Sequence, residues 1–314
     1  MPGIHHVTAI SGQPSRNVDF YTRTLGLRLV KKTVNFDDPG TYHLYYGDEQ
    51  GRPGTILTFF PWEHVAPGRN GDGLTEETAF RVPAESIGYW THRLIEKGVP
   101  HKALEKRFGE PVLAFTDPDG MSLALVGVAD AGSEPGWTDG SVPAEHAIRG
   151  FHGVTLMLRK AAPTGAILTG ALGFRETGRE GPFVRYETGV AGNGNAVTIR
   201  ETGGFLAGRL GRGGVHHIAF RAADDAEQAK IAKAVRDTYG LDPTEQRDRN
   251  YFRSVYFREP GGILFEIATD QPGFGVDEPV ESLGQALKLP PFLEKHRREI
   301  EAALPPIDAV GRAA

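Results

Sequence analysis

Short segments in which apolar side chains dominate or alternate with polar ones recur along the whole chain, and glycine or proline bounds most of them. Segments of this length and pattern predict β-strands. They occur in a fixed order: a strand, a stretch of helical periodicity, and then further strands. The pattern predicts four repeated units, over about residues 1–65, 75–128, 148–202 and 213–275.

Helical periodicity follows the opening strand of a unit. In the first unit the apolar residues with this spacing, which Gly26 interrupts, are Val18, Tyr21, Leu25 and Leu29. In the second unit the residues that share one helical face are Ile87, Trp90, Leu94 and Ile95. Residues 224–240 predict a helix in the fourth unit. Each unit is thus expected to combine one helix with several strands.

The units group into larger parts along the chain. Residues 1–128 hold the first pair of units, and residues 148–275 hold the second pair. Between them, residues 129–147 are rich in Gly, Pro, Ser and acidic residues and predict a linker. Residues 276–314 follow the last unit, and the amphipathic pattern of "PPFLEKHRREIEAAL" predicts a helical tail that packs on the domain or on a partner.

Composition limits the kinds of partner and metal site that the chain can have. The chain has 314 residues and a net charge of -5, with no surplus of basic residues to hold a phosphate backbone, so nucleic acid is not expected. Its longest apolar runs fall well short of the roughly 20 residues that cross a bilayer. The N-terminus shows no signal-peptide pattern, so a cytoplasmic location is expected. Because cysteine is absent, nitrogen and oxygen atoms must hold any metal.

A doubled histidine opens the first unit, in "GIHHVTAI", and the fourth, in "GGVHHIAF". Side chains alternate faces along a strand. His6 is therefore expected to share a face with Ile4 and Thr8, with His5 pointing away. The same parity places His217 with Val215 and Ala219, and His216 on the other face. One histidine of each pair can then reach a shared concavity.

A carboxylate interrupts the last apolar strand of the fourth unit. Glu266 lies in "GGILFEIAT", where burial without a partner would be costly. With His6 and His217 it would complete a set of two imidazoles and one carboxylate. That set leaves positions on Fe(II) open for substrate and O2.

The middle units have no such residues. Aligning the units places Gly153 opposite His6 and Ala124 opposite Glu266. The site is therefore expected between the first and fourth units, so the ends of the chain must meet while the middle units pair with each other.

The repeated unit resembles the βαβββ module of the vicinal oxygen chelate superfamily, which includes glyoxalases, fosfomycin-resistance proteins and extradiol ring-cleaving dioxygenases. Two stretches are similar to the branch that opens hydroquinones and chlorohydroquinones: "GLRLVKKTVNFDDPGTYHLYYGDEQGRPGTILTFFPW" and "RNYFRSVYFREPGGILFEIATDQPGF". The resemblance implies an α+β fold in which four modules form two curled mixed β-sheets.

The resemblance also implies further site residues. His5 and His216 match residues that line the active site in this branch, and Thr8, Arg249 and Tyr256 fall where it has polar active-site groups. Strand parity alone points His5 and His216 away from the metal, so either would need a twisted strand or a contact across the sheet.

Some assignments stay open in the sequence. The register of Tyr256 against Glu266 is undetermined, since a bulge would change the face of Tyr256. His43, among aromatic neighbours in "TYHLYYGD", fits either packing or a wall of the substrate pocket.

The expected function is ring cleavage of a hydroquinone-type aromatic diol by O2, dependent on Fe(II), with Mn(II) as the alternative metal. Two other functions stay open: a glyoxalase-like isomerase or thiol transferase, and a metal-free binding module. Glyoxalases of the superfamily usually supply four protein ligands, whereas three are found here. The sequence does not determine the ring substituents of the substrate. It also leaves the oligomeric state open, with a homo-oligomer as one of the options.

Overall fold

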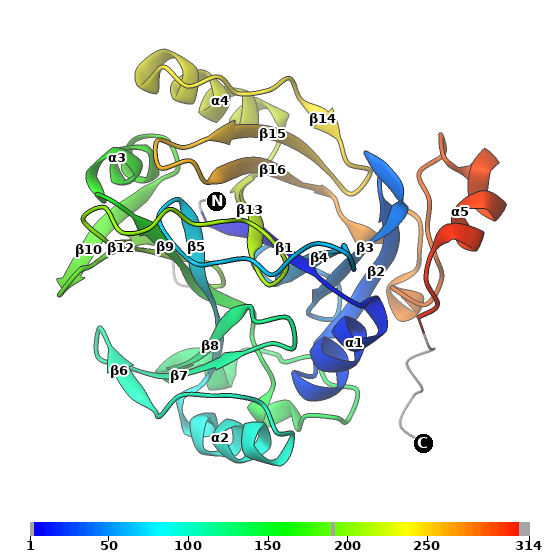
Figure 1. The fold of residues 1–314 in the computed structure, drawn as a ribbon, viewed down its shortest axis with the longest axis horizontal. Helices are drawn as coiled ribbons and strands as arrows, with labels where there is room; N and C mark the ends of the chain where they lie inside the picture. Colours follow the sequence, from blue (N-terminus) through cyan, green and yellow to red (C-terminus); the bar gives the residue numbers. More distant parts are fainter. Residues whose placement is uncertain (1–2, 190–191, 308–314) are drawn as a thin grey trace.

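Two eight-stranded sheets make up the computed structural model, which describes residues 3–189 and 192–307 (Figure 1). The first sheet combines the two ends of the chain. Its strands, in spatial order, are β14 (Arg247–Asp248), β15 (Phe252–Arg258), β16 (Leu264–Pro272), β13 (Val215–Ala222), β1 (Ile4–Ser11), β4 (Ile56–Pro61), β3 (Asp38–Gly47) and β2 (Arg28–Asn35). β1 and β13 join the first and fourth units as an antiparallel pair.

The second sheet combines the two middle units. Its strands, in spatial order, are β10 (Phe174–Glu180), β11 (Phe183–Thr188), β12 (Ala196–Glu201), β9 (Phe151–Leu158), β5 (Leu74–Pro83), β8 (Ser122–Val128), β7 (Glu110–Thr116) and β6 (Glu105–Arg107). β5 and β9 pair antiparallel at its centre, as β1 and β13 do in the first sheet. Both sheets mix parallel and antiparallel neighbours, which confirms the expected fold class.

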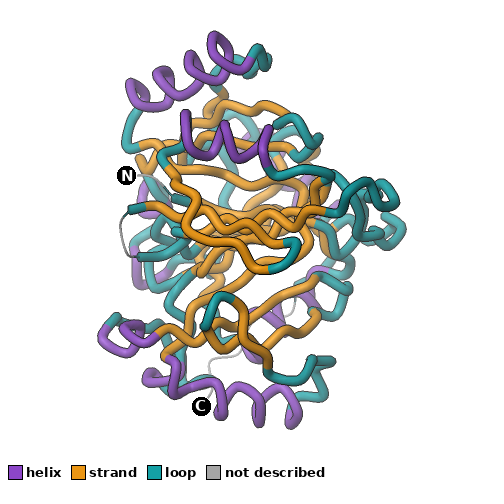
Figure 2. The backbone as a smooth tube through the Cα atoms, turned by 90° about the vertical axis from the view of Figure 1, so that its left-hand side faces the viewer, coloured by secondary structure: helices purple, strands orange, loops and turns teal. Residues whose placement is uncertain are grey.

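The helices lie on the outside of the two strand layers (Figure 2). They are α1 (Pro14–Asp19), α2 (Ile87–Glu96), α3 (Ala162–Gly170), α4 (Asp225–Tyr239) and α5 (Arg297–Ala303). A π-helical turn, η1 (Phe20–Thr24), continues α1. Short 3-10 turns are η2 (Ala84–Ser86), η3 (Ala129–Ser133), η4 (Ala144–His146), η5 (Phe274–Val276), η6 (Val280–Ser282) and η7 (Glu294–His296).

The expected helix boundaries are correct in part. In α4, the Asp224 side chain accepts a hydrogen bond from the backbone N–H of Glu227, and Gly240 ends the helix with φ of 64°. These are standard start and stop devices. The placement of Leu29 on the first helix is wrong, because the chain leaves the helix after Thr24 and Leu29 lies in β2. Ile95 does not share the buried face of α2, since it is 61% exposed.

Hydrophobic side chains between the sheets and the helices form the main core. Its members come from all four units and include Ile4, Phe80, Phe151 and Phe220.

The C-terminal tail packs against β2 and β3 of its own chain. Leu289, Leu293, Ile300 and Leu304 form a small core with Val34. Lys31, also on β2, is fully buried, and its Nζ lies 2.5 Å from Asp277 and 2.6 Å from Glu278. The tail is thus fixed to the first sheet by both apolar packing and a buried ionic cluster.

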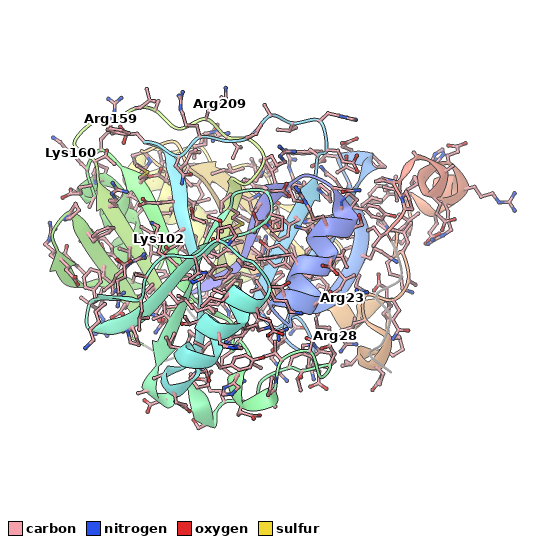
Figure 3. All side chains as sticks on the ribbon, turned by 60° about the horizontal axis from the view of Figure 1, so that its bottom comes forward. Arg23, Arg28, Lys102, Arg159, Lys160 and Arg209 are labelled. Carbon is pink, nitrogen blue, oxygen red and sulfur yellow. The ribbon has the colours of Figure 1, made fainter. Side chains whose placement is uncertain are left out.

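The labelled cationic side chains lie in separate places on the molecule (Figure 3). Arg159, Lys160 and Arg209 lie along one edge, whereas Arg23 and Arg28 lie beside α1. None of the helices in the described ranges is long and apolar enough to span a membrane.

Replacing Lys31 should strongly destabilise the fold. Lys31→Met would leave the Glu278 carboxylate, whose side chain is 3% exposed, without its cation, so the free energy of unfolding should fall by about 3–5 kcal/mol. Urea unfolding followed by tryptophan fluorescence measures the change. Lys233→Met is the matched control, because Lys233 pairs with Asp237 at 75% exposure and should contribute less than about 1 kcal/mol. Equal effects of the two substitutions would contradict the ionic role of Lys31.

Candidate metal centre

Three buried side chains converge on the concave face of the first sheet. Nε2 of His6 lies 3.3 Å, and Nε2 of His217 3.0 Å, from Oε2 of Glu266. One ligand atom from each of the three lies within 4.8 Å of the other two. The structure therefore brings together the three residues that the sequence singles out.

Strand register explains the convergence. His6 on β1 pairs with Ala219 on β13, and Ala219 pairs with Glu266 on β16. His6 and Glu266 thus flank a small residue. His217 lies two residues before Ala219 and projects from the same face of the sheet. Strands from both ends of the chain supply the three side chains.

The doubled histidines lie at two β-bulges. The register of β1 against β13 shifts between Ile4 and His6, and again opposite His216, so His5 and His216 have no cross-strand partner. The extra residue reverses the alternation of faces. The expectation that Ile4 lies with His6, and Val215 with His217, is wrong for this reason, since Ile4 and Val215 are in the hydrophobic core.

The bulges bring both members of each pair together through their rings. Nδ1 of His5 lies 2.9 Å from Nδ1 of His6, and Nδ1 of His216 lies 2.8 Å from Nδ1 of His217. If Nε2 of His6 binds a metal, the proton of that ring is on Nδ1 and is donated to Nδ1 of His5.

Burial and neighbours set the charge of the centre. Burial alone would raise the pKa of Glu266, but His6 and His217 outweigh it and hold that pKa well below its usual range. Oε1 of Glu266 accepts a 2.5 Å hydrogen bond from Ser254. Burial lowers the pKa of His217, and Glu266 only partly offsets this. The centre thus presents a carboxylate that faces two imidazole nitrogens.

These donors fit a divalent metal ion. Oε2 of Glu266 is buried without a hydrogen-bond partner, and the imidazole nitrogens that face it belong to ligand types that bind metals as neutral bases. Two histidines and a carboxylate on one side of an ion leave the opposite side open. Across the described ranges, these are the residues whose arrangement could hold a metal.

A cavity of about 330 Å³ opens above the three side chains. The aromatic rings in its walls come from Phe36, His43, Tyr45, Phe60, Trp62, Phe252 and Tyr256. Its size suits a small aromatic molecule.

Tyr256 and Arg249 form a polar side of this cavity. Tyr256 pairs directly with Glu266 across the β15–β16 hairpin, which fixes the register that the sequence left open. Arg249 donates from Nε to the Tyr256 hydroxyl at 3.3 Å and pairs with Asp37 at 3.1 Å. Burial and the Glu266 charge raise the pKa of Tyr256, so its phenol keeps its proton.

The other expected site residues take different places. His216 lines the cavity, and burial lowers its pKa to about 3. His5 and Thr8 are buried and do not line the cavity. His5 lies behind His6, whereas Thr8 pairs with His217 across the strands.

Thr58 occupies the position where a fourth ligand would lie. The strand registers of the first and fourth units correspond. In the first unit Thr8 pairs with Thr58, and in the fourth unit Ala219 pairs with Glu266, so Thr58 is equivalent to Glu266. The Thr58 hydroxyl lies 3.1 Å from Thr8 and 2.7 Å from His43. Within the part of the chain that the structure describes, the centre therefore has three protein ligands available and not four.

The second sheet repeats the backbone of the site without its ligands. Register shifts again occur beside Glu76 and His152, but Ala124 and Gly153 stand in the places of Glu266 and His6. Glu77 replaces His217 and is paired with Arg107 at 2.6 Å. A Cβ on Gly153 would lie 2.1 Å from the backbone oxygen of Ala196.

Sequence reasoning missed Ser254, Asp37 and the role of Thr58. Ser254 lies two residues before Tyr256, so strand alternation could have placed it on the same face. Asp37 reaches Arg249 from a turn more than two hundred positions away along the chain, and no local pattern indicates that contact.

Comparison with known proteins gives three further findings. The family pattern "Glyoxalase/Bleomycin resistance protein/Dioxygenase superfamily" matches residues 3–125. Over 307 residues the chain is 48% identical to "Putative ring-cleaving dioxygenase MhqO" of Bacillus subtilis (strain 168), with 98% of this chain and 96% of that protein covered. Over 305 residues it is 35% identical to "Chlorohydroquinone/hydroquinone 1,2-dioxygenase" of Sphingobium indicum, with 95% and 94% covered.

A solved structure matches over nearly the whole chain. The crystal structure of a "putative dioxygenase" from Bacillus subtilis subsp. subtilis str. 168 superposes with a TM-score of 0.91 at 46% identity. The superposition covers 98% of this chain and 97% of that one.

Replacing the first or the second histidine of a pair should affect metal binding differently. His6→Ala, His217→Ala and Glu266→Gln each remove one of three proposed ligands, so stoichiometric metal should be lost. His5→Ala and His216→Ala remove only the orienting partner, so affinity should fall by about 10- to 100-fold. Elemental analysis and titration calorimetry after anaerobic loading measure both. Glu77→Gln, at the equivalent place in the second sheet, is the control and should keep its metal. Loss of metal in His5→Ala with retention in His6→Ala would refute the ligand assignment.

Proposed function

Because this chain belongs to the Glyoxalase/Bleomycin resistance protein/Dioxygenase superfamily, we propose that it is an extradiol-type ring-cleaving dioxygenase. In this proposal Fe(II) is held by His6, His217 and Glu266, and O2 opens the ring of a hydroquinone-type substrate, chlorinated or not. Mn(II), which accepts similar ligands, is the alternative metal. The observation that carries the proposal is the three-ligand centre at the floor of an aromatic cavity.

The relatives support this reaction class. One of them is named "Putative ring-cleaving dioxygenase MhqO", and another is named "Chlorohydroquinone/hydroquinone 1,2-dioxygenase". Both matches extend over more than nine-tenths of each chain, so the whole fold and not one module is shared.

The metal would supply Lewis acidity and a route for electrons between the bound ring and O2. The cavity walls bind the ring and exclude water. Arg249 and Tyr256 orient a substrate hydroxyl: Tyr256 offers a phenol proton, and Arg249 holds that phenol in place while keeping its own positive charge.

His216 can donate a proton from the opposite side. Its Nδ1 is engaged with Nδ1 of His217, and the metal-binding tautomer of His217 makes Nδ1 of His216 the acceptor. The proton of the neutral His216 ring is then on Nε2. Since the ring lines the cavity, this N–H can donate to an oxygen of the reacting molecule.

The two alternative functions have less support. A glyoxalase-like isomerase or thiol transferase would gain from a fourth protein ligand, but the corresponding hydroxyl, that of Thr58, is bonded to Thr8 and His43. A metal-free binding module has no need of an unpaired buried carboxylate oxygen facing two imidazoles.

Oxygen uptake by the anaerobically iron-loaded protein tests the proposal. Hydroquinone or chlorohydroquinone should drive O2 consumption with a stoichiometry near one and give a ring-opened product visible by mass spectrometry. Glu266→Gln should abolish uptake. Tyr256→Phe should lower kcat by about 100-fold or more, as expected for loss of a positioned proton donor. Glu77→Gln should behave as the wild type. Failure of the iron- and manganese-loaded proteins to consume O2 with any hydroquinone or catechol would refute the proposal.

A further inference from the structure

His43 forms part of the cavity wall on the side away from Tyr256. It comes from β3, two strands beyond β1, whereas Tyr256 comes from β15, two strands beyond β13. Its ring centroid lies 4.4 Å from that of Phe60, and Phe60 lies 5.3 Å from Trp62. The cavity therefore has an aromatic side at His43 and a polar side at Arg249.

Both ring nitrogens of His43 are already bonded. Nε2 lies 2.7 Å from the Thr58 hydroxyl, and Nδ1 lies 2.8 Å from the Tyr45 hydroxyl. Thr58 donates its single proton to Thr8, so Thr58 must accept from the Nε2–H of His43. Nδ1 is then the acceptor for the Tyr45 proton. A single directed chain, from Tyr45 through His43 and Thr58 to Thr8, uses the full hydrogen-bonding capacity of the ring.

The phenol at the Tyr45 end of this hydrogen-bonded chain keeps its proton. Tyr45 is 1% exposed, and burial raises its pKa well above the usual value. Burial also lowers the pKa of His43 well below its usual value, so the ring is neutral and has one donor and one acceptor. The arrangement is suited to holding a ring in place and not to carrying protons.

We infer that His43 is a specificity-determining residue, an imidazole that faces the cavity as an apolar surface because Thr58 and Tyr45 occupy both of its nitrogens. This rests on the proposed function. The substrate edge that faces His43 and Phe60 carries hydrogen or an apolar substituent such as chlorine. A hydroxyl placed there would find neither ring nitrogen of His43 free, whereas the opposite edge meets Arg249 and Tyr256.

Binding of a matched pair of ligands tests the inference without turnover. Ethylhydroquinone and (hydroxymethyl)hydroquinone differ by a methyl against a hydroxyl at the end of one substituent. In anaerobic titrations of the metal-loaded protein, the wild type should bind the ethyl compound about 10- to 100-fold more tightly. Equal affinities for the two ligands would overturn the inference.

Variants distinguish an apolar wall from a polar one. His43→Phe keeps an aromatic surface, so it should keep the preference for the ethyl compound. Thr58→Val leaves the imidazole in place but frees its Nε2–H, so the preference should shrink to within about 3-fold. Tyr45→Phe frees Nδ1 and provides a second test if Thr58→Val is unstable. Loss of the preference in His43→Phe, or its full retention in both Thr58→Val and Tyr45→Phe, would contradict the role of the occupied nitrogens.

The imidazole tautomer gives an independent readout. Nitrogen-15 NMR of the labelled protein should show the His43 proton on Nε2 in the wild type, and the Nδ1–H form would overturn the chain described above. Neither measurement needs oxygen. A protein with the expected tautomer and ligand preference, but without O2 uptake, would therefore lose the proposed reaction while the selectivity of its cavity stands.

Discussion

The structure around the site depends on one buried charge. Glu266 is fully buried on a central strand, and a carboxylate in that position is stable only with compensating partners. One of its oxygens is satisfied by Ser254, while the other faces two imidazole nitrogens. Imidazoles bind metals as neutral bases, so a metal cation would compensate the carboxylate charge and complete this set of groups. Folding of the first sheet and metal binding are therefore expected to be coupled, because the ligands come from both ends of the chain.

The pairing of β1 with β13 places the ligands with the accuracy that a metal needs. The two strands run antiparallel, and each carries a bulge at the first histidine of its pair. The bulge lets adjacent residues bond ring to ring, so His5 orients His6 and His216 orients His217. Orientation through the second ring nitrogen raises ligand basicity and fixes the tautomer. In each doubled histidine, one residue is thus a proposed metal ligand and the other orients it through a hydrogen bond.

The amino-acid sequence was sufficient for the fold class, for the convergence of the three residues and for the pairing of the outer units. The fold class follows from the resemblance of the repeated unit to a known module, and the other two follow from residue type, strand alternation and the absence of ligands at Gly153 and Ala124. It was insufficient wherever a contact depends on a partner far along the chain. The faces predicted for Ile4 and Val215 from strand alternation were wrong, because a bulge arises from cross-strand pairing and leaves no local pattern in the sequence. The hydrogen bonds of His43 were hidden for the same reason: two strands must align before Thr58 can face it.

The second sheet separates what the backbone contributes from what the side chains contribute. It has the same strand order, the same antiparallel centre and the same two register shifts, yet its concave face holds ion pairs such as Arg107 with Glu77. A metal there would meet one carboxylate already bound to a guanidinium, and Gly153 leaves no room for a replacement ligand. Sheet curvature and β-bulges alone therefore form a cavity but not a metal centre. Three side chains at set positions decide which half of this molecule can hold a metal, and the hydrogen bonds that occupy His43 shape what that half can bind.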